Sequence, residues 1–242
     1  MVTCPAWISQ QPIAHRGLHS PGVPENSLAA FEAAIAQGYA IELDIQRLAD
    51  GQLAVFHDKD LMRLTGQAGS IFEQTAGRVK HLKLLGSEQT VPLLQEALAL
   101  IAGRVPVLIE IKNEGNAGPL ERSLAQIMGG YSGDCAIQAF NPHVLAWFKG
   151  NRPGVIRGQL SSDFEGEDLE WHKKLRLSNL LMNWASDPQF IAYDLRALPS
   201  LPVALTAALF QTPVVAWTVR TEADWNKAKR QADNIIFEGV RP

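Results

Sequence analysis

The chain has 242 residues, of which 46% are hydrophobic, and its formal net charge is −3. It contains no long basic run and no apolar stretch of the ~18 residues that a membrane span needs, and residues 1–12 do not show the basic region and apolar stretch typical of a signal peptide. Nucleic-acid binding and stable membrane insertion are therefore not indicated, and we expect a cytoplasmic protein. The length fits a single (β/α)8 barrel, which commonly has about 250 residues.

Short apolar runs alternate along the chain with longer segments of helical periodicity. In the first half, strands are predicted at 12–15, 40–46, 53–56 and 105–111, and helices at 27–37, 93–102 and 120–128. Asp50-Gly51 predicts a hairpin turn before the strand at 53–56. The less regular segment 60–85 is predicted to hold short helices.

The same alternation continues in the second half. Strands are predicted at 135–140, 155–160, 190–194, 213–219 and 234–237, and helices at 142–148, 167–184, 202–210 and 222–231, although LLMNW at 180–184 also fits a strand. Apart from the hairpin strand, eight strands alternate with helices, which predicts a parallel sheet. We expect a closed (β/α)8 TIM barrel forming one domain over 1–242. The main alternative is an open doubly wound sheet, which the missing glycine-rich dinucleotide motif disfavours.

Three carboxylates lie near strand ends, where the active site of a (β/α)8 barrel is built. Glu42 and Asp44 are two residues apart in one strand, so they point to the same side, and Glu110 ends a later strand. Crowded carboxylates keep their charge only beside a cation, and oxygen ligands suit Mg²⁺ or Ca²⁺ rather than Zn²⁺. The alternatives are a solvated edge strand for the first two and a simple ion pair with Lys112 for Glu110.

Two histidines and two cations accompany these carboxylates. His15 and Arg16 end the first strand, His57 ends the hairpin strand, and Lys112 ends the strand at 105–111. Arg16 and Lys112 suit a phosphate, and the two imidazoles titrate near neutral pH, as a general acid and base require. Trp217, near the end of a late strand, lines a pocket or belongs to the core. The other histidines are predicted to lie at the surface: His19, His81, His143 and His172.

In this order and spacing, these residues resemble the glycerophosphodiester phosphodiesterase family. The motifs are HRG (15–17), PEN (24–26), IELD (41–44), DGQLAVFHD (50–58), L-x-R-x-TG (61–66), VPLLQEAL (91–98), IEIK (109–112) and AWTV (216–219). The resemblance covers nearly the whole chain, and its specific motifs lie in the first 112 residues.

The resemblance implies a TIM barrel with a small inserted subdomain at about 50–91, after the second strand. It implies hydrolysis of a small-molecule glycerophosphodiester to glycerol 3-phosphate and an alcohol. The implied site comprises a divalent metal, Mg²⁺ or Ca²⁺, on Glu42, Asp44 and Glu110, an acid/base pair of His15 and His57, and phosphate contacts from Arg16 and Lys112. Our mechanistic hypothesis passes through a cyclic phosphate, with His15 as the first base.

Two segments depart from the family pattern. The family often ends its last strand with Ile-Thr-Asp before a proline, whereas this chain has Glu238 within IIFEGVRP. The segment 161–194 matches poorly and leaves the preferred alcohol open.

Two further functions stay in view: a lipase-type barrel acting on lipid phosphodiesters, and a barrel that only binds phosphodiesters or metal.

Overall fold

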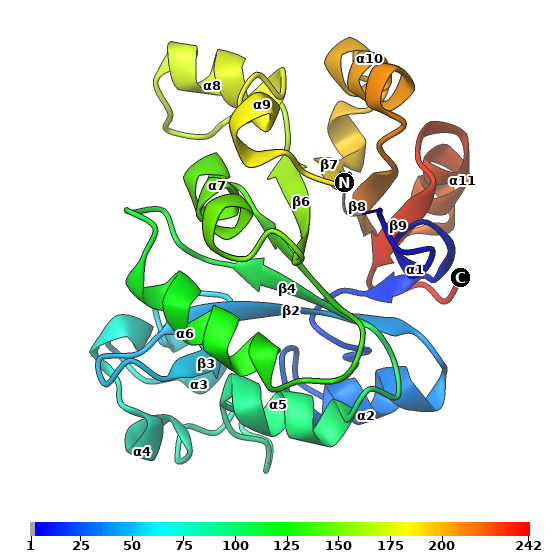
Figure 1. Cartoon of the computed structure of the whole chain (residues 1–242). Coiled ribbons are helices and arrows are strands. Elements are labelled where there is room, and N and C mark those ends of the chain that lie inside the picture. Colours follow the sequence, from blue (N-terminus) through cyan, green and yellow to red (C-terminus); the bar gives the residue numbers. More distant parts are fainter. Residues whose placement is uncertain (1–2) are drawn as a thin grey trace. The chain divides into compact units, whose positions relative to one another are not determined.

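The computed structural model of the chain describes residues 3–242, which divide into two compact units. The first unit, residues 14–135, starts at the end of β1 (Ile13–Ala14) and continues through alternating helices and strands (Figure 1). Its further elements are α2 (Leu28–Ala36), β2 (Ala40–Arg47), β3 (Leu53–Val55), α3 (Met62–Thr65), the 3₁₀ helix η1 (Ile71–Glu73), α4 (Ala76–Val79), α5 (Leu94–Ile101), β4 (Val107–Ile111) and α6 (Pro119–Gly129).

The second unit consists of the described residues up to 13 and residues 136–242. Its elements are α1 (Trp7–Gln10), β5 (Cys135–Ala139), α7 (Pro142–Asn151), β6 (Ile156–Ser161), α8 (Trp171–Ser178), α9 (Asn183–Ser186), β7 (Phe190–Asp194), the 3₁₀ helix η2 (Leu195–Ala197), α10 (Leu201–Phe210), β8 (Val214–Val219), α11 (Glu222–Gln231) and β9 (Asn234–Phe237). The sequence pattern predicts these elements except α1 and η2, which are too short to show a period, and it predicts one helix where the structure has α8 and α9.

Over the described residues, the strands form one sheet in the order β1-β9-β8-β7-β6-β5-β4-β2-β3, and β1 also pairs with β2. The sheet therefore closes into a (β/α)8 TIM barrel of eight strands, and β3 is an extra antiparallel strand beside β2. This confirms the predicted fold class. A doubly wound sheet is excluded because its two edges would stay unpaired.

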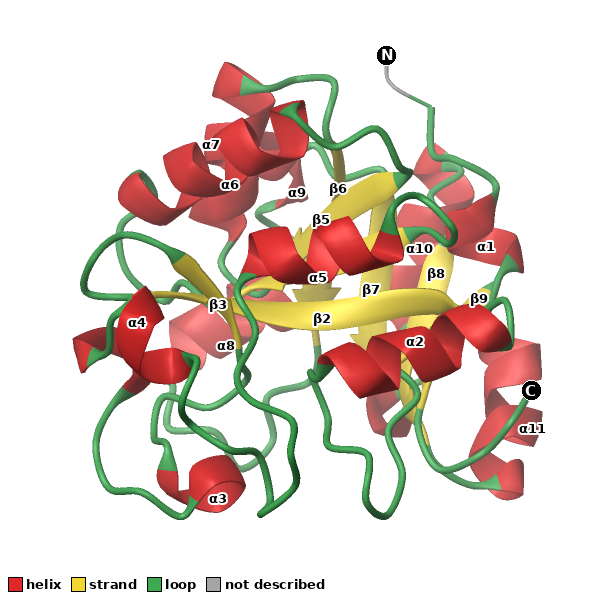
Figure 2. Cartoon of the chain, turned by 90° about the horizontal axis from the view of Figure 1, so that it is seen from below, coloured by secondary structure: helices red, strands yellow, loops and turns green. Residues whose placement is uncertain are grey.

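The strand β2 is buried along both faces. Ile41, Leu43 and Ile45 are fully buried, and so are the polar residues that alternate with them. The helix α2 begins after Ser27, whose Oγ accepts a hydrogen bond from the backbone nitrogen of Ala30 at 3.1 Å, the N-cap that the sequence predicts. Figure 2 shows α2 and α5 lying along β2. A solvated edge strand is thus wrong for this segment.

The segment between β3 and α5 has short helices, as predicted, and a small apolar core of its own. The strand β3 pairs with β2, with Val55 opposite Ile45, so the hairpin at Asp50-Gly51 is present. The core residues are Leu48, Ala54, Phe56, Leu61, Leu64, Ile71, Val79, Leu82, Leu84, Val91 and Leu93. The single domain over 1–242 and the subdomain at about 50–91 stay predictions.

The helix predicted over 167–184 is interrupted. It forms α8 and α9 with a turn between them, in which Leu180 takes a left-handed conformation with φ +57°. A helix cannot continue through such a residue, and LLMNW forms no strand. Among residues 3–242, no helix combines the length and the apolar character that crossing a membrane would require.

Candidate functional site

The first unit brings three carboxylates together on two neighbouring strands. Glu42 and Asp44 lie on β2 and Glu110 lies on β4, where Asp44 and Glu110 are register partners. One oxygen of each carboxylate lies within 4.8 Å of the other two. The three residues are 0%, 1% and 6% exposed. The spacing of two along β2 and the parallel register with β4 produce this convergence.

The carboxylates are held by neighbours from the segment after β1. Glu42 Oε2 accepts a hydrogen bond from the backbone nitrogen of Arg16 at 2.9 Å. Asp44 Oδ2 accepts one from Asn26 Nδ2 at 2.8 Å and lies 3.3 Å from Arg16 Nε. Glu42 Oε1 is buried without a hydrogen-bond partner among the described residues. Buried carboxylate oxygens normally have partners, so this atom is available to a ligand.

Opposite charges balance the cluster only in part. Burial, reinforced by the charges of Asp44 and Glu110, raises the pKa of Glu42 well above its ordinary value. Burial opposes the ionisation of Asp44, but Lys112 and Arg16 outweigh it and hold its pKa below the usual range. Lys112 Nζ lies 3.1 Å from Asp44 Oδ1 and also pairs with Glu110. Burial tends to lower the pKa of Lys112, and these carboxylates raise it.

The three carboxylates fit a hard divalent cation. They offer oxygen ligands only, they converge in a buried place, and one oxygen of Glu42 lacks a partner. Mg²⁺ and Ca²⁺ prefer carboxylate oxygens. A dication bound there would favour the ionised form of Glu42.

His15 and Arg16 follow β1 in a tight turn. Gly17 has φ +78°, and a Cβ at this position would lie 2.9 Å from the backbone carbon of Ala30, so only glycine fits. The Gly17 nitrogen donates to the backbone oxygen of Glu42 at 3.2 Å. This turn fixes where the side chains of His15 and Arg16 leave the backbone.

His57 follows β3 and is half-buried. Its Nδ1 lies 2.7 Å from Asp58 Oδ1. Its backbone oxygen accepts a hydrogen bond at 2.9 Å from Nε2 of Gln46, a buried residue two positions after Asp44 on β2. The segment carrying His57 is therefore tied to the strand that carries two of the three carboxylates.

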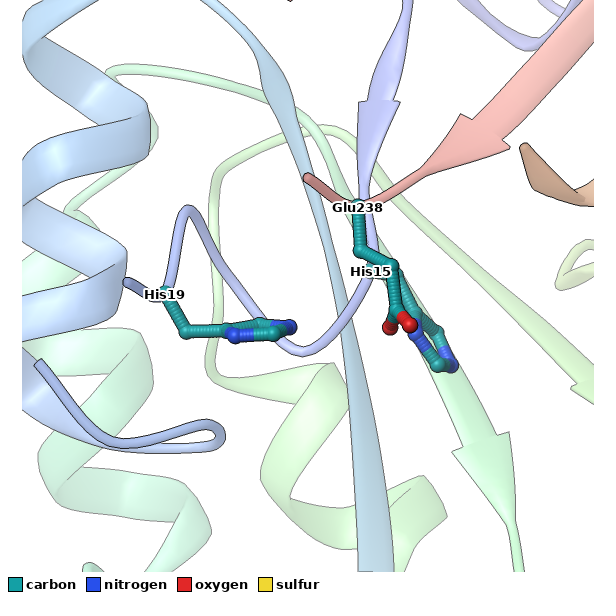
Figure 3. Close-up of side chains that lie close together, drawn as sticks. All are labelled: His15, His19 and Glu238. Atoms are coloured by element: carbon teal, nitrogen blue, oxygen red, sulfur yellow. The ribbon is translucent and has the colours of Figure 1, made fainter. Parts of the chain in front are cut away.

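His19, which the sequence analysis placed at the surface, lies close to His15 of the predicted site. It lies on the loop between β1 and α2, and its ring points toward His15 (Figure 3). A ring nitrogen of His19 lies within 4.8 Å of one of His15. His19 is half-buried rather than exposed, which a single histidine in a loop sequence does not reveal.

Trp217 and Glu238 belong to the second unit. Trp217 lies in β8 and packs edge to face against Phe140, with ring centroids 5.8 Å apart. Phe140 makes a similar contact with Phe164 at 6.0 Å. Glu238 follows β9 and forms an ion pair with Arg220. The pocket role of Trp217 stays a prediction, and whether Glu238 takes the place of the family's aspartate stays open.

Glu25, Asn26 and Asp58 contact predicted site residues through their side chains, and Arg63 contacts Glu25 and Asp58 in turn, although the sequence assigned none of them a role. All four lie in motifs that carry the family resemblance, PEN, HD and L-x-R, and this membership was the sequence signal that could have identified them. Their partners are 9 to 38 positions away for Glu25 and 18 for Asn26, and no local periodicity reports such contacts.

The family model described as "Glycerophosphoryl diester phosphodiesterase family" matches residues 15–238. A glycerophosphodiester phosphodiesterase of Caldanaerobacter subterraneus is 34% identical over 178 residues, which are 68% of this chain and 71% of that protein. Another, from Bacillus altitudinis, is 39% identical over 106 residues, which are 41% of this chain and only 43% of that protein.

Solved structures share the fold. A phosphodiesterase of Oleispira antarctica, in complex with the product sn-glycerol-3-phosphate, has a TM-score of 0.79 and 23% identity, covering 94% of this chain and 92% of that one. A glycerophosphodiester phosphodiesterase of Thermotoga maritima has a TM-score of 0.73 and 22% identity, covering 93% and 92%. At these identities, the similarity shows the barrel fold.

Proposed function

This chain belongs to the glycerophosphoryl diester phosphodiesterase family, and from that premise we propose that it hydrolyses glycerophosphodiesters to glycerol 3-phosphate and an alcohol. The observation that carries the proposal is the buried group of Glu42, Asp44 and Glu110, with Arg16 and Lys112 beside it. Three carboxylates on two adjacent strands, with two cations just beyond strand ends, match what binding a metal and a phosphodiester together requires. The product bound by the Oleispira antarctica protein is consistent with this substrate class.

We assign Glu42, Asp44 and Glu110 as ligands of Mg²⁺ or Ca²⁺. When bound, such an ion supplies positive charge that offsets the charge on the phosphoryl oxygens and favours an ionised glycerol hydroxyl. Arg16 and Lys112 are the cations that would contact the phosphoryl oxygens. Their ion pairs with Asp44 keep both side chains beside the ligand carboxylates.

We propose His15 and His57 as the general base and the general acid. In the first step, His15 takes the proton of the glycerol 2-hydroxyl while that oxygen attacks phosphorus. His57 gives a proton to the alcohol oxygen as its bond to phosphorus breaks, and a cyclic phosphate results. Water then opens the ring with the two roles reversed, which restores both histidines to their starting forms.

The test is release of glycerol 3-phosphate from glycerophosphocholine and glycerophosphoethanolamine, with Mg²⁺, with Ca²⁺ and with a chelator. Metal-dependent release that disappears in Glu42→Ala supports the substrate class and the assignment of Glu42 as a metal ligand. No release from folded, metal-loaded protein with either substrate would overturn it.

A lipid phosphodiester is the second candidate substrate. Trp171 at the start of α8 and Trp184 in α9 are 76% and 78% exposed, and exposed tryptophans are common where proteins meet lipid headgroups. Turnover of micellar lysophospholipid without turnover of soluble glycerophosphodiesters would favour this candidate. The reverse pattern would remove it.

A further inference from the structure

Arg63, in α3 of the segment between β3 and α5, connects the surroundings of His57 to those of Arg16. Toward His57, its guanidinium binds both oxygens of Asp58, with Nε 2.5 Å from Oδ2 and an Nη atom 2.9 Å from Oδ1. Asp58 Oδ1 in turn lies 2.7 Å from His57 Nδ1. Two parallel contacts from a planar guanidinium fix the plane of a carboxylate as well as its position.

The neighbouring edge of the same guanidinium, formed by Nη1 and Nη2, binds Glu25, and Nη2 is shared with Asp58. The two distances are 2.8 Å to Oε2 and 2.9 Å to Oε1. Glu25 also accepts a hydrogen bond from Arg16 at 2.5 Å, and Arg16 reaches Asp44 of the carboxylate group. Arg63 thus sits between two carboxylates, each of which holds a residue of the proposed machinery.

The partners of Arg63 are more buried than Arg63 itself. The side chains of Glu25 and Asp58 are 13% and 21% exposed, whereas that of Arg63 is 48% exposed. A single exposed ion pair contributes little, but here one guanidinium makes four contacts to two carboxylates that are themselves packed. Its hydrogen bonds to Glu25 and Asp58 raise the pKa of Arg63. Burial would raise the pKa of Asp58, yet the bonds from Arg63 and His57 hold it below its ordinary value.

An ionised Asp58 selects one tautomer of His57. A carboxylate can only accept hydrogen bonds, so the His57 nitrogen facing it, Nδ1, must carry a hydrogen. Neutral imidazole then has Nε2 as its acceptor, and the protonated ring delivers its proton from Nε2. The orientation of that nitrogen depends on where Asp58 is held.

We propose that Arg63 is a positioning residue of this enzyme: by clamping Asp58, it fixes the tautomer and orientation in which His57 exchanges protons with the leaving alcohol. The catalytic part of this inference rests on the proposed function. The structural part, the tautomer and orientation of the His57 ring, rests only on the contacts among Arg63, Asp58 and His57. A purely structural role, anchoring the inserted segment, is the competing explanation, because Leu61 and Leu64 beside Arg63 belong to the core of that segment.

The first experiment reads the His57 ring directly and needs no substrate. Nitrogen NMR of the full chain, labelled in histidine and assigned with His57→Ala, should show the Nδ1–H tautomer in the wild type. Arg63→Ala should shift His57 toward a mixture of tautomers. Arg78→Ala is the matched control, because Arg78 lies in the same segment and bonds Gln67 at 2.7 Å rather than a carboxylate. An unchanged His57 signal in Arg63→Ala would overturn the proposal.

The second experiment compares two leaving groups. With glycerophosphocholine, Arg63→Ala should lower kcat on the order of 10²-fold, the scale of a misplaced catalytic group. With a glycerophosphodiester of 4-nitrophenol, which departs without a proton, the loss should be much smaller. Arg63→Lys, which keeps the charge but loses the paired geometry, should fall between the two proteins. Equal losses on both substrates, or a loss that follows the fall in Tm, would show that Arg63 only stabilises the segment.

The two arms separate the possible failures. If no glycerophosphodiester is turned over by the wild type, the proposed function fails while the NMR result still decides whether Arg63 sets the His57 ring. If turnover is present and the ring is unaffected by Arg63→Ala, the function stands and the positioning role is wrong.

Discussion

Asp44 on β2 and Glu110 on β4 are direct partners in the parallel register of two buried strands, and their carboxylates converge with that of Glu42. Like charges in a buried place repel, so this pairing needs cations to persist. Lys112 supplies one of them, 3.1 Å from Asp44, whereas burial and the charges of Asp44 and Glu110 raise the pKa of Glu42. The pairing has consequences that can be measured without an activity assay.

Metal binding should stabilise the folded chain, and Glu42→Gln should remove most of that effect. A ligand at 100 times its Kd adds about 2.7 kcal/mol to the free energy of unfolding. We expect the Tm of the wild type to rise when Mg²⁺ or Ca²⁺ is added, and the Tm of Glu42→Gln to rise far less. Glu114→Gln, at an exposed glutamate paired with Lys59, is the control and should respond as the wild type does. Equal shifts in all three proteins would contradict the assignment of the ligands.

When metal is absent, Glu42→Gln should increase the free energy of unfolding. The pKa of Glu42 is raised in the folded state. Between the unfolded and the folded pKa, the folded chain therefore keeps a proton on Glu42 that the unfolded chain has lost. The stability that this proton provides is complete below the unfolded pKa and is lost as the pH rises toward the folded pKa. In the presence of chelator, Glu42→Gln should therefore be more stable than the wild type at neutral pH. Urea unfolding of both proteins at pH 5 and pH 8 measures this: the difference should be larger at pH 8.

Gly17→Ala should be destabilising, because Gly17 combines φ +78° with a Cβ position 2.9 Å from Ala30. We expect a loss of about 1–3 kcal/mol in the free energy of unfolding. Gly22→Ala is the matched control, since Gly22 has φ +83° but no atom within 4 Å of its Cβ position. Chemical denaturation should show a larger loss at Gly17, and equal losses would mean that the backbone conformation alone accounts for the cost.

His15→Ala and His57→Ala should each lower kcat by about 10² to 10⁴, the usual contribution of a general acid or base. His143 is exposed at the start of α7, and His143→Ala should keep the wild-type rate. Steady-state release of glycerol 3-phosphate measures the three variants under one condition. Near-normal kcat in both His15→Ala and His57→Ala would rule out the acid/base pair, even if the enzyme class is right.

The sequence predicted the architecture well because the signals for it are local. The strand 40–46 and the helix 27–37 were recognised from periods of two and of 3.6 residues, and both are present within one residue at each end. The resemblance to the glycerophosphodiester phosphodiesterase family is confirmed, as are the barrel and the enzyme class. Cytoplasmic localisation, the nature of the metal and the roles of the site residues stay predictions.

Local patterns were less reliable where the chain turns without a periodic signal. The helix predicted over 167–184 is broken by the left-handed Leu180, and α8 has no buried residue at all. Helical periodicity reports which residues share a face, but it does not report whether anything packs against that face. The segment 161–194, which departs most from the family pattern, contains this broken helix.

By itself, the sequence determined that Glu42 and Asp44 point to one side of a strand, since alternation along a strand is a property of the backbone. It also placed His15, His57 and Glu110 at strand ends. Only the tertiary structure decided that Glu110 is the register partner of Asp44, and that Arg63 clamps Asp58 and Glu25 together. The physical reason is distance along the chain: such contacts form when loops return to the same place, and the course of a loop depends on packing that no short stretch of sequence encodes.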